Sequence, residues 1–297
     1  MPLYITNIAA MQSARMMGQI QSGMNTCFQR LSSGKRINSA KDDPAGFQIA
    51  NRLTSQINGY KQGKRNLSDG IALAQVMEGA MDETRDMLQK IRTLAVQAAT
   101  GTLTTADRLS ITAEVGQYCQ EINRIAKKTT YAGSPILNGN KGGLYDDKGK
   151  IQIQASGVAN DTIGIPGFEQ GFTISGISTY TNNAGGSFLF EENGELRFTL
   201  STAEKAQAVL GHIDSYINAV ASYQGTLGGI QNRMESAIRL NDTMAENLAD
   251  ARSRIEDTDY AEECANLAAL QIRQQACSMI MKQAFNNKNI ILSLLGG

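Results

Sequence analysis

The 297-residue chain carries 28 basic and 28 acidic side chains and has a formal net charge of zero. This balance, without any run rich in lysine and arginine, gives no general reason to bind nucleic acid. No stretch of 18 consecutive apolar residues predicts a membrane span, and residues 1–7 lack the basic and apolar regions of an ordinary secretory signal. We therefore expect neither nucleic acid nor a membrane as a partner.

The first 43 residues predict a helix and an extended connector. Apolar residues recur at helical spacing from Ile5 to Leu31, and the run 32–34 (Ser-Ser-Gly) ends the pattern. Residues 1–41 contain five basic side chains and no acid. Asp43 followed by Pro44 is a strong start signal for the next helix.

A second helix is expected from Pro44 to about residue 100. Its apolar seam follows steps of three and four residues, with one shift between Ala74 and Met77. Gly101 is the expected residue after its C-terminus. The run 104–107 (Thr-Thr-Ala-Asp) then resembles a capping box with Asp in place of Glu, and a returning helix is predicted as far as Thr129.

The middle of the chain changes to a β-rich character between residues 131 and 200. Residues 150–154 alternate strictly between polar and apolar side chains, which predicts a strand. Residues 188–200 predict a hairpin around Asn193-Gly194. This region is too small for a large independent domain, and helix is expected to resume at residues 201–204.

A long helix with an unbroken heptad seam is predicted from Leu227 to Thr258. Such a helix needs partners to bury its stripe, so it is expected to form a three-helix rod with the two earlier helices. Asn241 lies within the seam. Either it fixes the register of the helices or it is tolerated at an edge of the bundle.

The last segment, residues 261–295, is apolar on nearly every face. A helix of this kind is buried or membrane-bound, and here burial must come from other copies or from a partner. The run 250–263 contains six acids and two arginines. It is a candidate electrostatic partner of the basic first 41 residues.

The four cysteines, Cys27, Cys119, Cys264 and Cys277, form no CxxC pair, and the single histidine is His212. A zinc site is therefore unsupported. We expect the cysteines to be small apolar residues in helix interfaces. The alternative is a disulfide between Cys27 and Cys277, which approach each other if the terminal helices pair antiparallel.

Catalytic chemistry finds no support in the sequence. His212 has no recognisable nucleophile arrangement, the paired carboxylates fit solvated helix faces, and the glycine pairs do not make a phosphate loop. We predict neither an enzyme nor a cofactor.

Four motifs nevertheless resemble one family. Residues 28–46 resemble the N-terminal signature of bacterial flagellin. The C-terminal signature of that family is matched by three further segments, residues 230–233, 251–261 and 291–295, which resemble it. The resemblance covers about residues 3–165 and 201–297. It implies a short flagellin that has only about residues 167–200 where most relatives carry large variable domains.

The resemblance implies a mainly α fold in which both chain ends form an antiparallel helical rod, with a small β-hairpin region in the middle. The expected division is 1–43 for the N-terminal half of the inner helical domain with the connector, 44–137 for rod helices, 138–200 for the β-rich outer part, 201–260 for the C-terminal rod helix, and 261–297 for the C-terminal half of the inner domain.

The resemblance also implies the site residues. Polymerisation through the inner helices is expected of Ile5, Ile8, Ile20, Met24, Cys27, Leu31, Leu267, Leu270, Ile272, Ile280, Leu292, Leu294 and Leu295. Connector and inter-subunit charges are Arg30, Lys35, Arg36, Lys41, Asp42, Asp43, Arg252, Arg254, Glu256 and Asp257. One further patch is expected either to contact the innate immune receptor for flagellin or to serve only rod packing and subunit contacts. It consists of Gln89, Lys90, Leu94, Gln97 and Glu114.

The expected function is self-assembly into the extracellular flagellar filament for swimming. The implied partners are other copies, the flagellar export apparatus with its chaperone, the hook-associated junction and cap proteins, and the innate receptor. The sensed relatives usually have Arg at the position of Lys90, and Lys lacks the bidentate fork of Arg.

Two other functions fit part of the sequence. A flagellin-like junction protein shares the helical ends, but residues 253–257 and the tail 292–295 favour flagellin. A signalling coiled coil such as a chemoreceptor cytoplasmic domain fits the heptads, but not the β-rich middle or the uncovered tail. The apolar stripes also predict that both ends are disordered in the unassembled subunit and fold on assembly.

Overall fold

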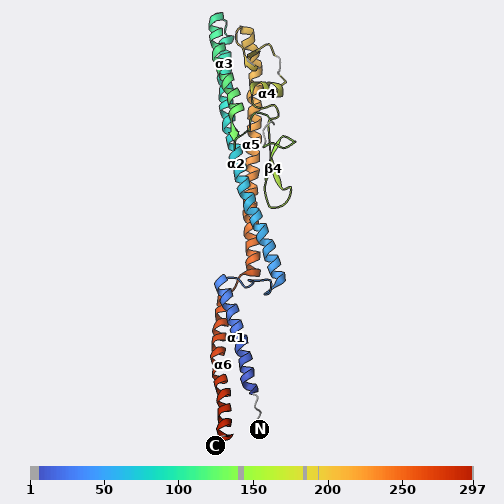
Figure 1. The fold of residues 1–297 in the computed structure, drawn as a ribbon. Coiled ribbons are helices and arrows are strands. Elements are labelled where there is room, and N and C mark those ends of the chain that lie inside the picture. Colours follow the sequence, from blue (N-terminus) through green and yellow to red (C-terminus); the bar gives the residue numbers. More distant parts are fainter. Residues whose placement is uncertain (1–6, 140–143, 183–185, 193, 296–297) are drawn as a thin grey trace. The chain divides into compact units, whose positions relative to one another are not determined.

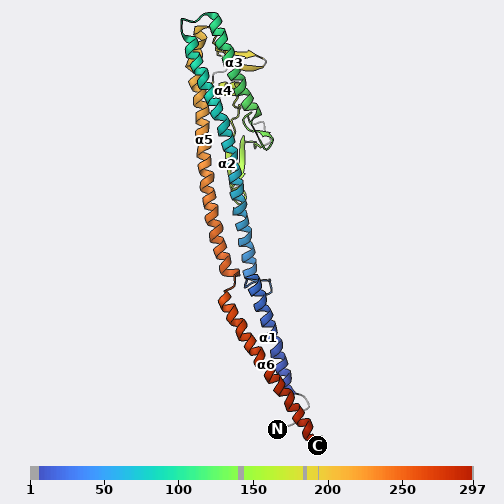
Figure 2. The same ribbon diagram turned by 90° about the vertical axis from the view of Figure 1, so that its left-hand side faces the viewer.

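The structure, a computed structural model, describes residues 7–139, 144–182, 186–192 and 194–295, with side chains as far as residue 286. The chain forms two compact units, one of residues 1–57 and 246–297 and the other of residues 58–245. Figures 1 and 2 show that both are built mainly from long helices, with the β segments confined to the second unit. The prediction of a mainly α fold is confirmed.

The first unit contains α1 (Ile8–Ser33) and α6 (Tyr260–Leu295), which lie side by side in both views. Asn7 caps α1 because its side-chain oxygen accepts the N–H of Ala10. Gly34 ends the helix with φ of 72°, a left-handed conformation that glycine adopts without steric cost. The predicted end of this helix is confirmed.

Helix α2 (Pro44–Ala99) begins where the sequence predicts. The side-chain carboxylate of Asp43 accepts the backbone N–H groups of Ala45 and Gly46 at 3.1 and 3.0 Å. These bonds satisfy two of the amide groups that a helix start leaves without partners.

The second unit is a bundle of α3 (Thr105–Lys128) with parts of α2 and α5 (Ala203–Glu256). Hydrogen bonds join α2 to α5 in antiparallel register. The side-chain amides of Gln231 and Gln224 donate to the carboxylates of Glu78 and Asp82, each at 3.0 Å. The guanidinium of Arg92 donates to Asp214 at 2.9 Å. The predicted seam of α2 is buried from Met77 to Ala98, so the three-helix rod is confirmed.

The start of α3 is a complete capping box. Thr104 accepts the N–H of Asp107, and the Asp107 carboxylate accepts the N–H of Thr104. Helix α2 ends at Ala99, so Gly101 lies just beyond its C-terminus as expected, but Gly101 is not among the residues with positive φ. The Arg108 guanidinium instead donates to the carbonyls of Ala98 and Thr100 at 2.9 and 2.8 Å. A side chain from the next helix therefore takes the place of a left-handed cap.

The predicted seam of α5 is buried from Leu227 to Met234 but not along its whole length. Met244 is 40% exposed. Thr258 lies beyond the helix, which ends at Glu256, and its N–H donates to the carbonyl of Gly34. The single continuous seam to Thr258 is therefore wrong at its C-terminal end, because the chain leaves the helix to pair with the connector.

Three antiparallel two-stranded sheets and one short helix fill the middle of the chain. They are β1 (Thr130–Tyr131) with β2 (Ser134–Pro135), β3 (Lys150–Gln154) with β4 (Thr162–Pro166), β5 (Leu189–Glu192) with β6 (Glu195–Phe198), and α4 (Ile174–Tyr180). The strand at 150–154 and the late hairpin are confirmed, although Asn193 itself lies outside the described residues. The sequence predicted a β-rich character here but did not locate β1, β2, β4 or α4.

The middle segment shares its core with the helices. Phe198 of β6 contacts Tyr216 of α5 with ring centroids 5.2 Å apart, and both side chains are almost fully buried. Asn123 of α3 joins two of these elements, since it accepts the N–H of Ile174 and donates to Glu195. The β region is therefore part of the helical unit.

Asn241 has a role that neither interpretation of the sequence foresaw. Its side-chain amide donates to the carbonyl of Ala155, 2.7 Å away, in the turn after β3. The residue is 5% exposed. It therefore ties helix α5 to the β region and satisfies a buried backbone carbonyl.

Candidate polymerisation surface

The terminal helices α1 and α6 pair antiparallel in a defined register. The amide of Asn7 donates to the carbonyl of Ala284 at 2.8 Å, and the thiol of Cys277 donates to the carbonyl of Ser13 at 3.3 Å. Towards the other end of the pair, Arg30 lies 3.6 Å from Glu263. The predicted electrostatic match between the acid-rich run and the basic N-terminal segment is confirmed at this contact.

Only a narrow stripe of each terminal helix is covered by the other. The buried residues of α1 are Ala10, Ser13, Met24 and Cys27, and those of α6, among its described side chains up to residue 286, are Glu263, Cys277 and Ala284. Gly23 faces Leu270, and a β-carbon at Gly23 would come within 3.3 Å of a Leu270 methyl group. The pair is thin, because a two-helix contact buries only one face of each partner.

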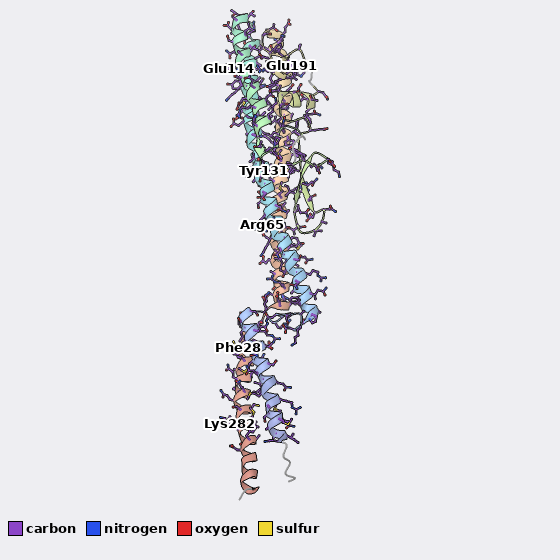
Figure 3. All side chains as sticks on the ribbon, in the orientation of Figure 1. Phe28, Arg65, Glu114, Tyr131, Glu191 and Lys282 are labelled. Carbon is purple, nitrogen blue, oxygen red and sulfur yellow. The ribbon has the colours of Figure 1, made fainter. Side chains whose placement is uncertain are left out.

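Large apolar side chains remain exposed on both helices. Their exposed fractions are 59% for Ile8, 60% for Met11, 59% for Met16 and 49% for Phe28 on α1, and 67% for Ile272, 65% for Met279, 59% for Ile280 and 53% for Phe285 on α6. Phe28 is labelled on this pair in Figure 3. We call these eight residues the uncovered face. So many exposed apolar groups on one helix pair are typical of an interaction surface.

The predicted polymerisation residues fall into four groups. Ile8, Ile272 and Ile280 belong to the uncovered face, and Ile20, Leu31, Leu267 and Leu270 are half-buried. Met24 and Cys27 face α6 of the same chain. Ile5 and the side chains of Leu292, Leu294 and Leu295 lie outside the described residues. The other five residues of the uncovered face, which the prediction did not name, are Met11, Met16, Phe28, Met279 and Phe285.

An apolar groove runs between the two helices. Its lining includes Met16 and Ile20 of α1 and Leu270, Cys277 and Ile280 of α6. The groove is also lined by the polar side chains of Ser13, Gln19 and Arg273, and it connects the half-buried residues to the uncovered face.

The connector is tied to the end of α5 by charges. Lys35 pairs with Glu256 at 2.6 Å, and the guanidinium of Arg36 donates to the carbonyl of Ile255 at 2.8 Å. Glu256 is 8% exposed and also lies 3.9 Å from Arg252. One buried carboxylate therefore faces two cations.

The remaining predicted charges lie in different environments. Asp42 accepts the N–H groups of Ser39 and Asn38, and these bonds hold the pKa of its carboxyl below the usual value of 3.8. Arg254 pairs with Asp250 on the surface of its own helix. Lys41 and Asp257 have exposed side chains, and neither makes an ion pair within the described part of the chain.

The register rules out the Cys27–Cys277 disulfide. Cys277 contacts Ser13, and Cys27 lies 14 residues further along α1, which is roughly 20 Å at 1.5 Å per residue. Cys27 lies beside Glu263, and burial together with that carboxylate raises the pKa of the thiol to about 11. Cys119 is also buried, whereas Cys264 is exposed, so the expectation of an interface position is wrong for Cys264.

The predicted receptor patch lies on adjacent surfaces of α2 and α3. The Lys90 ammonium is 5.7 Å from the centre of the Tyr118 ring, whose hydroxyl donates to Glu114 at 3.4 Å. Gln89, Lys90, Gln97 and Glu114 are exposed, and Leu94 is half-buried. Glu114 is labelled on α3 in Figure 3.

Comparisons with known proteins agree with this architecture. The profile of the bacterial flagellin N-terminal helical region matches residues 5–142, and that of the bacterial flagellin C-terminal helical region matches residues 210–295. Flagellin B of Vibrio anguillarum is 31% identical to the chain, and polar flagellin A of Vibrio parahaemolyticus is 32% identical. Each alignment covers 98% of both chains.

The chain belongs to the bacterial flagellin family. This flagellin is accordingly a filament subunit of the bacterial flagellum, located in the extracellular filament, and a structural protein rather than an enzyme. Among its described helices, none is both long and apolar enough to cross a bilayer. The alignments extend over 370 residues, more than the 297 of this flagellin, so the relatives carry additional residues. That difference fits a reduced middle region.

A solved structure supports the fold. A protein described as a flagellar hook-associated protein from Vibrio parahaemolyticus superposes with a TM-score of 0.55 at 15% identity, covering 73% of this flagellin and all of that chain. Because the identity is low, this likeness concerns the fold alone. The choice of flagellin over a junction protein rests on the sequence relatives.

Proposed function

We propose that filament assembly buries the uncovered face of α1 and α6 between neighbouring copies, and that this burial drives polymerisation. The observation that supports the proposal is the set of eight exposed apolar side chains on a helix pair that covers only a narrow stripe of itself. Burying one such side chain contributes roughly 1.5–3 kcal/mol. Several per subunit, repeated along a filament, offset the entropy lost on association.

Two substitutions test this proposal without touching the covered stripe. Ile272→Gln and Ile280→Gln place an amide where burial is expected, so seeded growth into filaments should fall at least about tenfold for the pair. Val158→Gln is the matched control, because Val158 is also 61% exposed but lies in the other unit. If electron microscopy shows normal filaments from the double variant, the uncovered face is not needed for assembly.

We further propose that the charges left free by the connector contact other subunits. Lys41 and Asp257 are exposed and have no ion-pair partner in the described part of their own chain, so they are available to a neighbour. Arg30, Lys35, Arg36, Asp42, Asp43, Arg252 and Glu256 would act indirectly, by holding the connector. Lys41→Glu should lower the seeded growth rate, and paired reversal with Asp257→Lys should recover it if the two residues meet across subunits.

The remaining partners are inferred from family membership. We infer that the export apparatus delivers the subunit, that a chaperone covers the apolar tail segment 261–297 beforehand, and that junction and cap proteins bind the filament ends. A chaperone that covers α6 should protect Arg273 and Lys282 against trypsin while cleavage at Arg15 continues. Equal cleavage at all three sites with saturating chaperone would contradict this role.

The receptor patch also remains a proposal. Gln89, Lys90, Gln97 and Glu114 offer polar contacts around the half-buried Leu94. In a cell reporter assay, Leu94→Ala should lower signalling by the innate receptor if the patch binds it. Unchanged signalling, with an intact helical bundle, would leave these residues to rod packing alone.

A further inference from the structure

The described methionines differ widely in exposure. Met11, Met16 and Met279, on the two terminal helices, are 60%, 59% and 65% exposed. Met77, Met81 and Met234, in the helical bundle, have no exposed surface. Exposure does not simply follow the unit, since Met24 on α1 is 8% exposed and Met244 on α5 is 40% exposed, but Met11, Met16 and Met279 are the most exposed methionines among the described side chains.

We propose that Met11, Met16 and Met279 are oxidation sites, and that their conversion to the sulfoxide by a peroxide-class oxidant prevents the unassembled subunit from polymerising. The inference rests on the proposed role of the uncovered face. In each step the thioether sulfur attacks one peroxide oxygen, so that an S–O bond forms and the O–O bond breaks. The sulfur loses two electrons, hydrogen peroxide is reduced, and water leaves.

The position of these sulfurs gives the modification its effect. Met279 lies seven residues after Ile272, two turns along the same side of α6, and both are more than 60% exposed. Met16 lines the groove between the helices together with Ile20 and Ile280. A sulfoxide turns a flexible apolar group into a strongly polar one, so each oxidised position brings an oxygen without a hydrogen-bond partner into a surface that must lose its water.

Assembly itself should determine when the modification occurs. The thioethers are accessible in the free subunit, and the proposed contacts cover them in the filament. The reaction therefore acts on subunits before incorporation and spares assembled filaments.

The test uses the full-length chain with Cys264→Ser throughout, because Cys264 is exposed and a thiol competes for peroxide. After brief treatment of the unassembled subunit with hydrogen peroxide, peptide mass spectrometry should find sulfoxide at Met11, Met16 and Met279 at least about tenfold faster than at Met77, Met81 and Met234. Seeded growth should fall at least about fivefold, and methionine sulfoxide reductase should restore it.

The matched control replaces Met11, Met16 and Met279 by leucine, a change that keeps an apolar side chain of similar volume. This variant should polymerise like the parent and keep growing after peroxide treatment. Equal peroxide sensitivity of the leucine variant, or normal growth of the oxidised parent, would overturn the proposal. A failure of the proposed function is distinguishable, because it appears as normal filaments from the Ile272→Gln and Ile280→Gln variant without any peroxide.

Discussion

Glu256 shows how one side chain can hold a junction of the chain. It is 8% exposed, pairs with Lys35 of the connector at 2.6 Å, and lies 3.9 Å from Arg252 of its own helix. The backbone of the connector is bound to the same residue, since the N–H of Arg36 donates to the Glu256 carbonyl. Most other ion pairs of this flagellin are solvent-exposed and contribute little to stability.

Replacing Glu256 by Gln should therefore weaken the attachment of the connector to the end of α5. The substitution leaves Lys35 and Arg252 without their shared carboxylate, and we expect a loss of about 1–3 kcal/mol in the free energy of unfolding. Urea unfolding followed by circular dichroism measures it. Asp250→Asn is the control, because its pair with Arg254 is 62% and 79% exposed. Equal effects of the two substitutions would contradict a special role for Glu256.

At the scale of elements, two glycines let the β region approach α2 closely. A β-carbon at Gly63 would lie 2.0 Å from the carbonyl oxygen of Ala155, and one at Gly59 would lie 2.8 Å from the α-carbon of Gly157. Both obstacles are backbone atoms, which cannot rotate away. The turn after β3 is therefore seated on the helix itself, where Asn241 of α5 also holds the Ala155 carbonyl.

Alanine at Gly63 should separate these elements. We expect Gly63→Ala to lower the free energy of unfolding by at least about 2 kcal/mol, because the turn must shift and its buried hydrogen bonds must stretch. Gly79→Ala is the control on the same helix, since nothing lies within 4 Å of its added β-carbon. It should stabilise by up to about 1 kcal/mol through helix propensity. Loss of stability in both variants would show that helix geometry, rather than the contact with the turn, is responsible.

Across the whole molecule, the two units differ in how much core they bury. The unit of residues 58–245 encloses a continuous core with many side chains that have no exposed surface, such as Met77, Leu88 and Val115. The α1–α6 pair buries only a stripe. Local stability follows buried apolar contact, so the ends should open far more easily than the bundle.

Hydrogen exchange tests this difference in stability. In the unassembled subunit, backbone amides of α1 and α6 should exchange at least about 100-fold faster than those of α2 between Leu67 and Ala98. In the filament the terminal amides should become protected, because the proposed contacts with neighbouring copies would cover the helices. Equal protection of both regions before assembly would contradict the prediction that the ends fold on assembly.

Truncation tests whether the terminal helices are needed for assembly but not for the stability of the bundle. Removing residues 1–40 or 262–297 should leave a soluble rod with its bundle intact, because the core of residues 58–245 draws on neither end. Such a rod should not polymerise, even when seeded with filament fragments. Filaments in electron micrographs of either truncated form would contradict the expectation that both terminal helices are needed for assembly.

Much of this fold could be predicted from the sequence, because helix ends depend on local signals. Asp43-Pro44, the Thr104–Asp107 box and Ser33-Gly34 act within one turn of the chain, so they fix helix ends wherever the helices lie. The seam of α2 and the hairpin of residues 188–200 depend on side-chain periodicity alone. The uncovered tail was also predictable, because α6 has more apolar faces than one partner helix can bury.

Only the tertiary structure decided what depends on register and on contacts between distant segments. A shift of a few residues between α1 and α6 would exchange one pair of partners for another, so the sequence left a Cys27–Cys277 bridge open, whereas the register places Cys277 at Ser13. Asn241 looked like a seam residue because its partner, the Ala155 carbonyl, is a backbone group 86 positions away. Side-chain patterns record how much apolar surface a helix must bury, but not which backbone atom or neighbouring helix will meet it.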